Sequence, residues 1–242
     1  MDLFESWIAK QRIAHRGLFC EEAPENTVAA FLRAANNGYA VELDVRRLDD
    51  GTLIVFHDET LGRMTNRDGY VSTLKKENLA DLFVGKSKEK IPTLQEALDA
   101  IGGKVPVLID VKSKGATGAI ENALIEILNK YEGDFAVQSD NPLTLEIFKN
   151  NAPHFFRGQV ATDRPDKSVP FLKRRALANL KYNKNVSCPH FIAYDLRGLP
   201  NPYVAKYRKK VPVIAWTVKS NDDFERIKNF ADNIIFENRI NG

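Results

Sequence analysis

Eight apolar runs of strand length alternate with segments of helical period along this 242-residue chain, and this alternation limits the fold more than any other feature. Strands that alternate with helices form parallel sheets. The runs start near residues 12, 39, 105, 135, 155, 191, 212 and 233. Eight such units predict a (β/α)8 TIM barrel, formed as a single domain by residues 1–242. An open doubly wound sheet is the alternative, but it usually has a glycine-rich loop after its first strand, and none follows here.

The alternation is interrupted once, after the second strand. The segment LDDGT (Leu48 to Thr52) joins VELDVRR to LIVFHD, and Asp-Gly between two apolar runs is typical of a hairpin. The connection is too short for a parallel crossover. We therefore expect residues 53–57 to run antiparallel to the preceding strand, and residues 46–90 to form a small insertion that carries His57. After the last strand only NRING follows, so the eighth helix is expected to be missing.

Two helix starts are marked by capping residues. In PENT, Asn26 or Thr27 can cap a helix that runs to about Asn37, and in IPTLQEAL, Thr93 and Glu96 have the spacing of a capping box. The remaining helices are expected at residues 117–131, 142–150, 165–182, 202–209 and 221–230.

Composition excludes several classes of partner. Lys and Arg exceed Asp and Glu by only 3 (35 against 32), and no run of five like charges occurs, so we expect no nucleic-acid partner. No stretch approaches 18 apolar residues, so no stable membrane anchor is expected. Two cysteines far apart, Cys20 and Cys188, favour free thiols, and with no signal peptide the expected location is the cytoplasm. The sequence does not indicate an oligomeric state.

Polar residues end several of the predicted strands, at the face where a barrel of this type holds its active site. Strand periodicity places Glu42 and Asp44 on one face, and Asp110 and Lys112 on one face. Clustered carboxylates repel, and a bound cation removes that cost. Because the ligands would all be oxygens, the pattern favours one divalent cation, Mg²⁺ or Ca²⁺, over zinc. The full set of strand-end residues is His15, Arg16, Glu42, Asp44, Asp110, Lys112, Gln138, Gln159, Tyr194, Asp195, Trp216 and Glu237.

Structural roles remain open for several of these residues. His15 could be a half-buried histidine bonded to the backbone, and His57 could be a loop histidine oriented by Asp58. Glu42 and Asp44 could form ion pairs with Arg46, Arg47 or Lys112. Gln138 and Trp216 lie at strand ends, where they suit the wall of a substrate pocket, although Trp216 could equally be core.

An ordered set of motifs resembles the glycerophosphodiester phosphodiesterase family. The matching segments are IAHRG (13–17), PENT (24–27), GYAVELDV (38–45), DGTLIVFHD (50–58), L.R.T (61–65), G.V (69–71), IPTLQEAL (91–98), ID.K (109–112) and AWTV (215–218). They span nearly the whole chain. The resemblance implies a (β/α)8 barrel with a small insertion after the second strand. It also implies an enzyme that cleaves glycerophosphodiesters, which are small-molecule substrates, to glycerol 3-phosphate and an alcohol.

The resemblance also implies roles for individual residues. His15 and His57 would be the acid–base pair, and Arg16 and Lys112 would bind the phosphate. Glu42, Asp44 and an acid on the third barrel strand would hold the divalent cation. That third acid is Asp110, where the family usually has Glu, so its reach is one methylene shorter. Three further departures are Asp140 for Phe, Lys219 for Asn, and Glu237 for the Asp of a TD.P pattern.

Two alternative functions follow from these features. One is a phosphodiesterase that acts on lysophospholipids in the manner of lysophospholipase D. The other is a catalytically impaired barrel that binds a ligand, for which the changes at Asp110 and Glu237 are the argument. Retention of both histidines, Glu42, Asp44 and Lys112 favours the enzyme.

Overall fold

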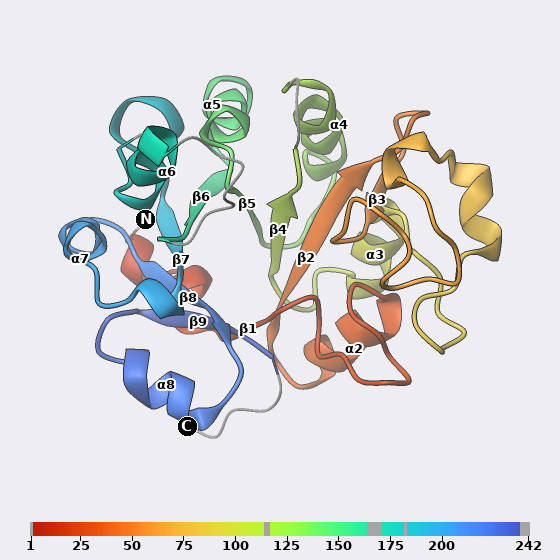
Figure 1. The fold of residues 1–242 in the computed structure, drawn as a ribbon, viewed down its shortest axis with the longest axis horizontal. Helices are drawn as coiled ribbons and strands as arrows, with labels where there is room; N and C mark the ends of the chain where they lie inside the picture. Colours follow the sequence, from red (N-terminus) through yellow and green to blue (C-terminus); the bar gives the residue numbers. More distant parts are fainter. Residues whose placement is uncertain (1, 114–116, 164–170, 182, 238–242) are drawn as a thin grey trace. The chain divides into compact units, whose positions relative to one another are not determined.

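The computed structural model describes residues 2–113, 117–163, 171–181 and 183–237 of the chain, and Figure 1 shows its strands and helices. The fold is a (β/α)8 TIM barrel, as the alternation predicts. Its strands follow one another in the order β1-β9-β8-β7-β6-β5-β4-β2, β1 also pairs with β2, and β3 is added at the outside of β2. The strands are β1 (Ile13–Ala14), β2 (Ala40–Arg47), β3 (Leu53–Val55), β4 (Val107–Val111), β5 (Phe135–Ser139), β6 (Phe156–Ala161), β7 (Phe191–Asp195), β8 (Val213–Val218) and β9 (Asn233–Phe236).

Helices connect these strands. The α-helices are α1 (Trp7–Lys10), α2 (Val28–Asn36), α3 (Leu94–Ile101), α4 (Ala119–Leu128), α5 (Pro142–Asn151), α6 (Phe171–Ala178), α7 (Pro202–Arg208) and α8 (Asn221–Ile227). Short 3₁₀ helices are η1 (Leu3–Glu5), η2 (Val71–Thr73), η3 (Lys76–Asp81) and η5 (Leu196–Gly198), and Asn183–Ser187 form a π-helical turn.

The local predictions hold with small shifts. Thr27, rather than Asn26, caps α2 through its side chain. Thr93 and Glu96 form the predicted capping box of α3. Helix α4 begins at Ala119, directly after Gly118 with its positive φ (118°), and ends at Leu128, so it is shorter than expected at both ends. Of the helix predicted at 165–182, the structure describes only α6 and the turn after it. The missing eighth helix concerns residues 238–242, which lie outside the described residues.

The chain falls into two compact units, and the first comprises residues 14–135. In it, β2 pairs in parallel with β4 and antiparallel with β3, through pairs such as Arg46↔Ile54, which confirms the predicted hairpin. Beyond this hairpin, the insertion has a small apolar core of its own. Its fully or largely buried members are Leu48, Ile54, Phe56, Leu61, Val71, Leu74, Leu79, Leu82, Val84 and Ile91. This core holds the backbone around His57 in place.

The other unit comprises residues 1–13 and 136–242. Its strands β6, β7, β8 and β9 pair in parallel in that order. The Asn233 side chain of β9 donates to the carbonyl oxygens of Ile8 and Gln11, both at 2.7 Å, and so ties the leading helix α1 to the end of the chain.

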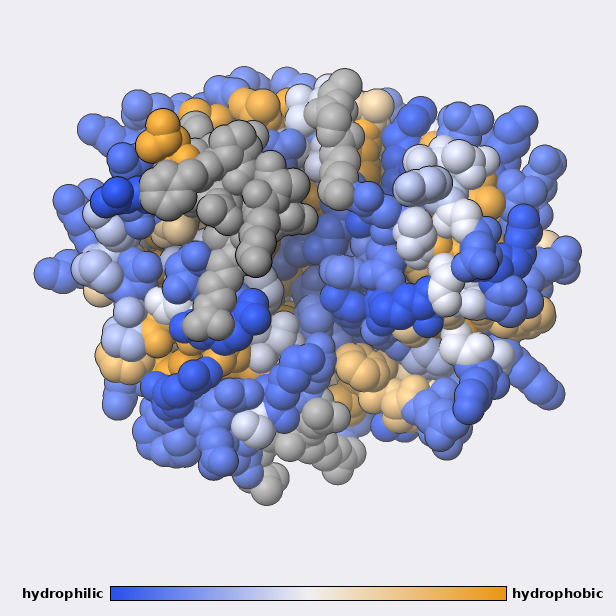
Figure 2. Space-filling view, in the orientation of Figure 1, coloured by the Kyte–Doolittle hydropathy of each residue, from blue (hydrophilic) through white to orange (hydrophobic). Residues whose placement is uncertain are grey.

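The surface and the cysteines agree with the composition. Figure 2 shows mainly hydrophilic side chains on the face in view, with hydrophobic ones in separate small patches. Cys20 and Cys188 are both free thiols. Among the described helices, none combines the length and the hydropathy that crossing a bilayer requires.

Candidate active site

Three buried carboxylates gather in the middle of β2 and near the end of β4. Asp44 and Asp110 are direct neighbours in the parallel register of these strands, and Glu42 lies two residues before Asp44 on the same face. Their exposed fractions are 2% for Glu42, 1% for Asp44 and 7% for Asp110. One carboxylate oxygen of each lies within 4.8 Å of the others. The structure thus brings together the three residues that the sequence predicts as metal ligands.

Two cations lie against these acids. The Lys112 Nζ contacts Asp44 Oδ1 at 3.0 Å and Asp110 Oδ2 at 3.1 Å. The Arg16 Nε lies 3.2 Å from Asp44 Oδ2, and the backbone N–H of Arg16 donates to Glu42 Oε2 at 2.8 Å. The backbone of Arg16 is in the left-handed region (φ 56°), which turns the chain after β1 so that this N–H faces the cluster. The sequence leaves open an ion pair between Asp44 and Lys112, and this ion pair is present. It places a cation among the acids.

The PENT turn contributes two residues to the site that sequence reasoning did not assign to it. The Asn26 Nδ2 donates to Asp44 Oδ2 at 2.8 Å, and the backbone N–H of Asp44 donates to Asn26 Oδ1 at 3.2 Å. Glu25 Oε1 accepts from Arg16 Nη1 at 2.6 Å. The signal for Glu25 and Asn26 is the PENT motif of the family resemblance, from which only a capping role for Asn26 is predicted.

A chain of charged groups orients His57. Its Nδ1 lies 2.6 Å from Asp58 Oδ1, and its carbonyl oxygen accepts from Arg46 Nε at 2.7 Å. Arg63 donates to Asp58 through Nε and to Glu25 Oε1 through Nη2 at 2.7 Å. Because Glu25 also pairs with Arg16, these contacts link the insertion to the loop after β1. We call the series His57, Asp58, Arg63, Glu25 and Arg16 the ion-pair chain.

Both predicted acid–base residues act electrostatically on Asp44. His15 directly follows β1, and the charged forms of His57 and His15 both lower the pKa of Asp44. Burial lowers the pKa of His57 itself; the Asp44 carboxylate opposes this effect, and Arg16 and Lys112 add to it. His57 is therefore biased toward its neutral form, in which its Nε2 can accept a proton.

The acids differ in how well the protein neutralises them. Burial raises the pKa of Glu42 well above its ordinary value, and repulsion from Asp44 and Asp110 adds to the rise. Burial acts on Asp44 in the same direction, but Lys112 and Arg16 outweigh it and hold the pKa of Asp44 well below its usual range. Glu42 thus differs from Asp44 in that Lys112 and Arg16 lower its pKa but do not outweigh the effect of burial.

This donor set fits a divalent cation. Three convergent carboxylates that are almost fully buried outnumber the two cations, Arg16 and Lys112, that contact them. Oxygen-only ligands suit the hard cations Mg²⁺ and Ca²⁺. Among the described residues, this is the one cluster of three or more acidic, His or Cys side chains with metal-binding spacing.

The six other strand-end residues of the prediction lie in the unit of residues 1–13 and 136–242, and three of them bear on the site predictions. Gln138 on β5 is 3% exposed. Trp216 on β8 has a buried Nε1 without a hydrogen-bond partner in the described part of the chain. Glu237, just after β9, pairs with Lys219 at 2.7 Å, so two of the departures from the family pattern contact each other. Roles for Gln138 and Trp216 in substrate binding stay predictions.

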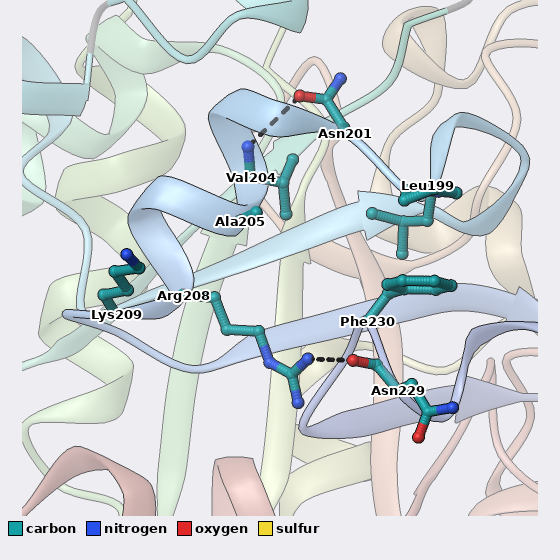
Figure 3. A pocket seen from close by; sticks show the side chains of 9 residues that line it. Leu199, Asn201, Val204, Ala205, Arg208, Lys209, Asn229 and Phe230 are labelled. Carbon is teal, nitrogen blue, oxygen red and sulfur yellow. Dashed lines mark hydrogen bonds between the residues drawn. The ribbon is translucent and has the colours of Figure 1, made fainter.

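Another cavity, of about 250 Å³, lies in that unit between α7 and the turn after α8 (Figure 3). Apolar side chains such as Leu199, Val204 and Phe230 line it. The guanidinium of Arg208 beside it is used structurally, since it donates to the carbonyl oxygens of Asn229 and Ala231 and pairs with Asp232. None of the predicted site residues lines this cavity.

Comparison with known proteins agrees with the fold and gives the family. The model of the glycerophosphoryl diester phosphodiesterase family matches residues 15–241. A glycerophosphodiester phosphodiesterase of Caldanaerobacter subterraneus subsp. tengcongensis is 32% identical over 239 residues, which cover 92% of this chain and 92% of that protein. Glycerophosphodiester phosphodiesterase 1 of Homo sapiens is 36% identical over 131 residues, 49% of this chain and 39% of that protein. A solved phosphodiesterase of Oleispira antarctica, in complex with the product sn-glycerol-3-phosphate, is similar with a TM-score of 0.79 at 24% identity, covering 93% of this chain and 92% of that chain.

Proposed function

This chain belongs to the glycerophosphoryl diester phosphodiesterase family, and we propose that it hydrolyses glycerophosphodiesters to glycerol 3-phosphate and an alcohol with the help of a divalent cation. Membership makes it a phosphodiesterase that acts on glycerophosphodiesters. The products, the roles of the two histidines and the dependence on metal form the proposal. The observation that carries it is the buried cluster of Glu42, Asp44 and Asp110 beside Lys112 and Arg16. The product found in the similar Oleispira antarctica structure supports the choice of glycerol 3-phosphate.

Charge determines what the cluster does. A phosphodiester is an anion, and its transition state concentrates charge on the non-bridging oxygens. Arg16 and Lys112 supply positive charge for those oxygens, and fixed charges in a water-poor site act more strongly than in bulk water. Glu42, Asp44 and Asp110 would hold the divalent cation, which when bound supplies Lewis-acid neutralisation at the phosphate.

The two histidines would move the protons. His57 is oriented by Asp58 and by the Arg46 contact to its carbonyl oxygen, and His15 follows β1 at the same cluster. One of them would accept the proton of the attacking hydroxyl, and the other would donate a proton to the leaving alkoxide. Each transfer of this kind typically contributes about 10²–10⁴-fold to the rate.

The test compares histidine variants on one substrate. We expect His15→Ala and His57→Ala each to lower kcat on glycerophosphocholine by about 10²-fold or more, with unchanged circular dichroism. His154→Ala is the matched control, because His154 packs edge-on against Phe155 in the other unit. Full activity of either site variant would refute the acid–base assignment. Lysophosphatidylcholine is assayed in parallel, and faster turnover of it would favour the lysophospholipid alternative.

Metal dependence needs its own measurement. We expect EDTA to abolish activity, Mg²⁺ or Ca²⁺ to restore it, and isothermal titration to show one cation bound per chain. Glu42→Gln should remove that binding signal, because the variant loses one of the three carboxylates. Activity that is indifferent to chelation would refute the metal requirement.

The cytoplasmic location predicted from the sequence stays a prediction, which cell fractionation would check.

A further inference from the structure

A cavity of about 360 Å³ lies next to the site, within the unit formed by residues 14–135. Arg46 and Arg47 from the end of β2, and Lys112 and Ser113 following β4, line one part of it. The rest is lined by residues of the insertion, among them Glu59 and Tyr70, and by the first turn of α4. Figure 1 shows these segments near the ends of β2 and β4. Its volume lies in the range of small-molecule sites. Lys112 is shared, since it lines the cavity and its Nζ contacts Asp44 and Asp110.

Two arginines that line the cavity, Arg46 and Arg47, have uncommitted hydrogen-bond donors. In the described part of the chain, Arg46 makes one side-chain hydrogen bond, from Nε to the His57 carbonyl oxygen, and neither Arg46 nor Arg47 forms an ion pair. The buried Ser113 Oγ also has no hydrogen-bond partner among the described residues. Glu59, the acidic residue in the lining, is near enough to Arg46 to act on it electrostatically. The lining therefore carries several cationic donors, the hydroxyls of Tyr70, Ser72 and Ser113, and the carboxylate of Glu59.

These groups suit a ligand rich in hydroxyls and without positive charge. Hydroxyl oxygens accept from guanidinium N–H groups, and hydroxyl protons can be donated to Glu59. A quaternary ammonium is recognised by aromatic cages, but Tyr70 is the one aromatic residue among the described lining residues, and it is 60% exposed. A choline group would therefore meet no cage and the three cations Arg46, Arg47 and Lys112, against the single carboxylate of Glu59.

We propose that this cavity binds the alcohol half of the substrate, and that it selects uncharged polyols, such as inositol, over cationic alcohols, such as choline. The inference rests on the proposed function, because the ligand is placed through the phosphate that Lys112 would hold. The alcohol half differs from one glycerophosphodiester to another, whereas the glycerol half is common to all of them. Selectivity between substrates must therefore come from the residues that contact the alcohol.

The test measures kcat/KM for glycerophosphoinositol and glycerophosphocholine in the wild type and in Arg47→Gln. Arg47 is exposed and lies outside the predicted catalytic set, so the variant should fold normally. We expect about a tenfold loss for glycerophosphoinositol, mainly through KM, which is what the loss of a charge-assisted hydrogen bond produces. Glycerophosphocholine should change little. Arg67→Gln is the matched control, since it removes the same charge from an exposed insertion residue outside this cavity, and it should leave the ratio of the two substrates unchanged.

Three results would overturn the subsite. An unchanged ratio in Arg47→Gln would show that the cavity does not contact the alcohol. An equal loss for both substrates would show that it binds the shared glycerol half. Faster wild-type turnover of glycerophosphocholine than of glycerophosphoinositol would contradict the selectivity. In each of these cases diester hydrolysis itself persists, so the proposed function stands. A wild-type enzyme that hydrolyses neither substrate refutes the proposed function, and the subsite is refuted with it.

Discussion

His190 makes the stability of this protein depend on pH far from the active site. It lies just before β7, and its Nδ1 accepts the backbone N–H of Arg157 at 3.0 Å, while its own backbone N–H donates to the Arg157 carbonyl oxygen. Its ring packs edge-on against Phe156. Burial, together with the Arg157 guanidinium, lowers the pKa of His190 from 6.5 to about 4. Protonation would remove the acceptor that the Arg157 N–H uses.

The sign and the size of the effect follow from this lowered pKa. Between pH 6.5 and 4 the imidazole of His190 binds a proton in the unfolded chain but not in the folded chain. The contribution of His190 to the free energy of unfolding is therefore fully present above pH 6.5 and is lost as the pH falls toward 4. The pKa difference corresponds to about 3 kcal/mol at most, and solvent screening of the half-buried ring reduces the expected loss to about 1–2 kcal/mol.

The assay is urea unfolding at pH 7 and pH 4.5 for the wild type and His190→Asn. The Asn Oδ1 can accept the same Arg157 N–H but binds no proton, so the variant should lose about 1–2 kcal/mol less than the wild type on acidification. At pH 7 it should be less stable by about 1 kcal/mol, because the contact with Phe156 is lost. His154→Asn removes a similar edge-on contact, with Phe155, and is the control. Equal acid sensitivity of the wild type and His190→Asn would refute the reasoning.

Two further predictions concern the site. Arg63→Gln breaks the ion-pair chain between Asp58 and Glu25, so we expect kcat to fall about tenfold and the pH profile of kcat to shift, with cation binding unchanged. Arg67→Gln is the control, and an unshifted pH profile in Arg63→Gln would contradict a role of Arg63 in positioning His57. Lys112→Met leaves Asp44 and Asp110 without their shared cation, so we expect the metal-free protein to lose about 3–5 kcal/mol of stability in urea unfolding. Added Mg²⁺ or Ca²⁺ should recover part of this loss, and a stability that the cation leaves unchanged would refute the shared-charge explanation.

The fold was predictable because its signals are local. The period of the apolar residues and the capping residues identify strands and helices without knowledge of what these elements contact, as Thr93 and Glu96 show for α3. The Asp-Gly turn was enough to separate β3 from the parallel series. The exact ends of the strands were harder to predict from the sequence, because they depend on which strands pair with one another. Strand β2 extends to Arg47 because Arg46 and Arg47 pair with Ile54 and Leu53 of β3.

The site was predictable only in part, for a related reason. Strand periodicity places Glu42 with Asp44 on one face of β2, and Asp110 with Lys112 on one face of β4. The register of β2 and β4 brings the three acids together. The partners of these acids come from loops, whose course has no periodic signal. Asn26 reaches Asp44 and Arg63 reaches Glu25 because of turns with unusual backbone angles and the packing of the insertion. No spacing rule in the sequence expresses such contacts.

The ion-pair chain also has a consequence for the order in which the site is made. Its members and the three acids all fall between Arg16 and Lys112, and the partners Glu25 and Arg63 are separated by 38 residues. Closing a loop of that length costs only slightly more entropy than closing one of half its length. A ribosome releases the N-terminal part of a chain first, so all these charged residues have been synthesised before the first residue of β6. The charged centre can therefore assemble on a chain whose last four barrel strands do not yet exist.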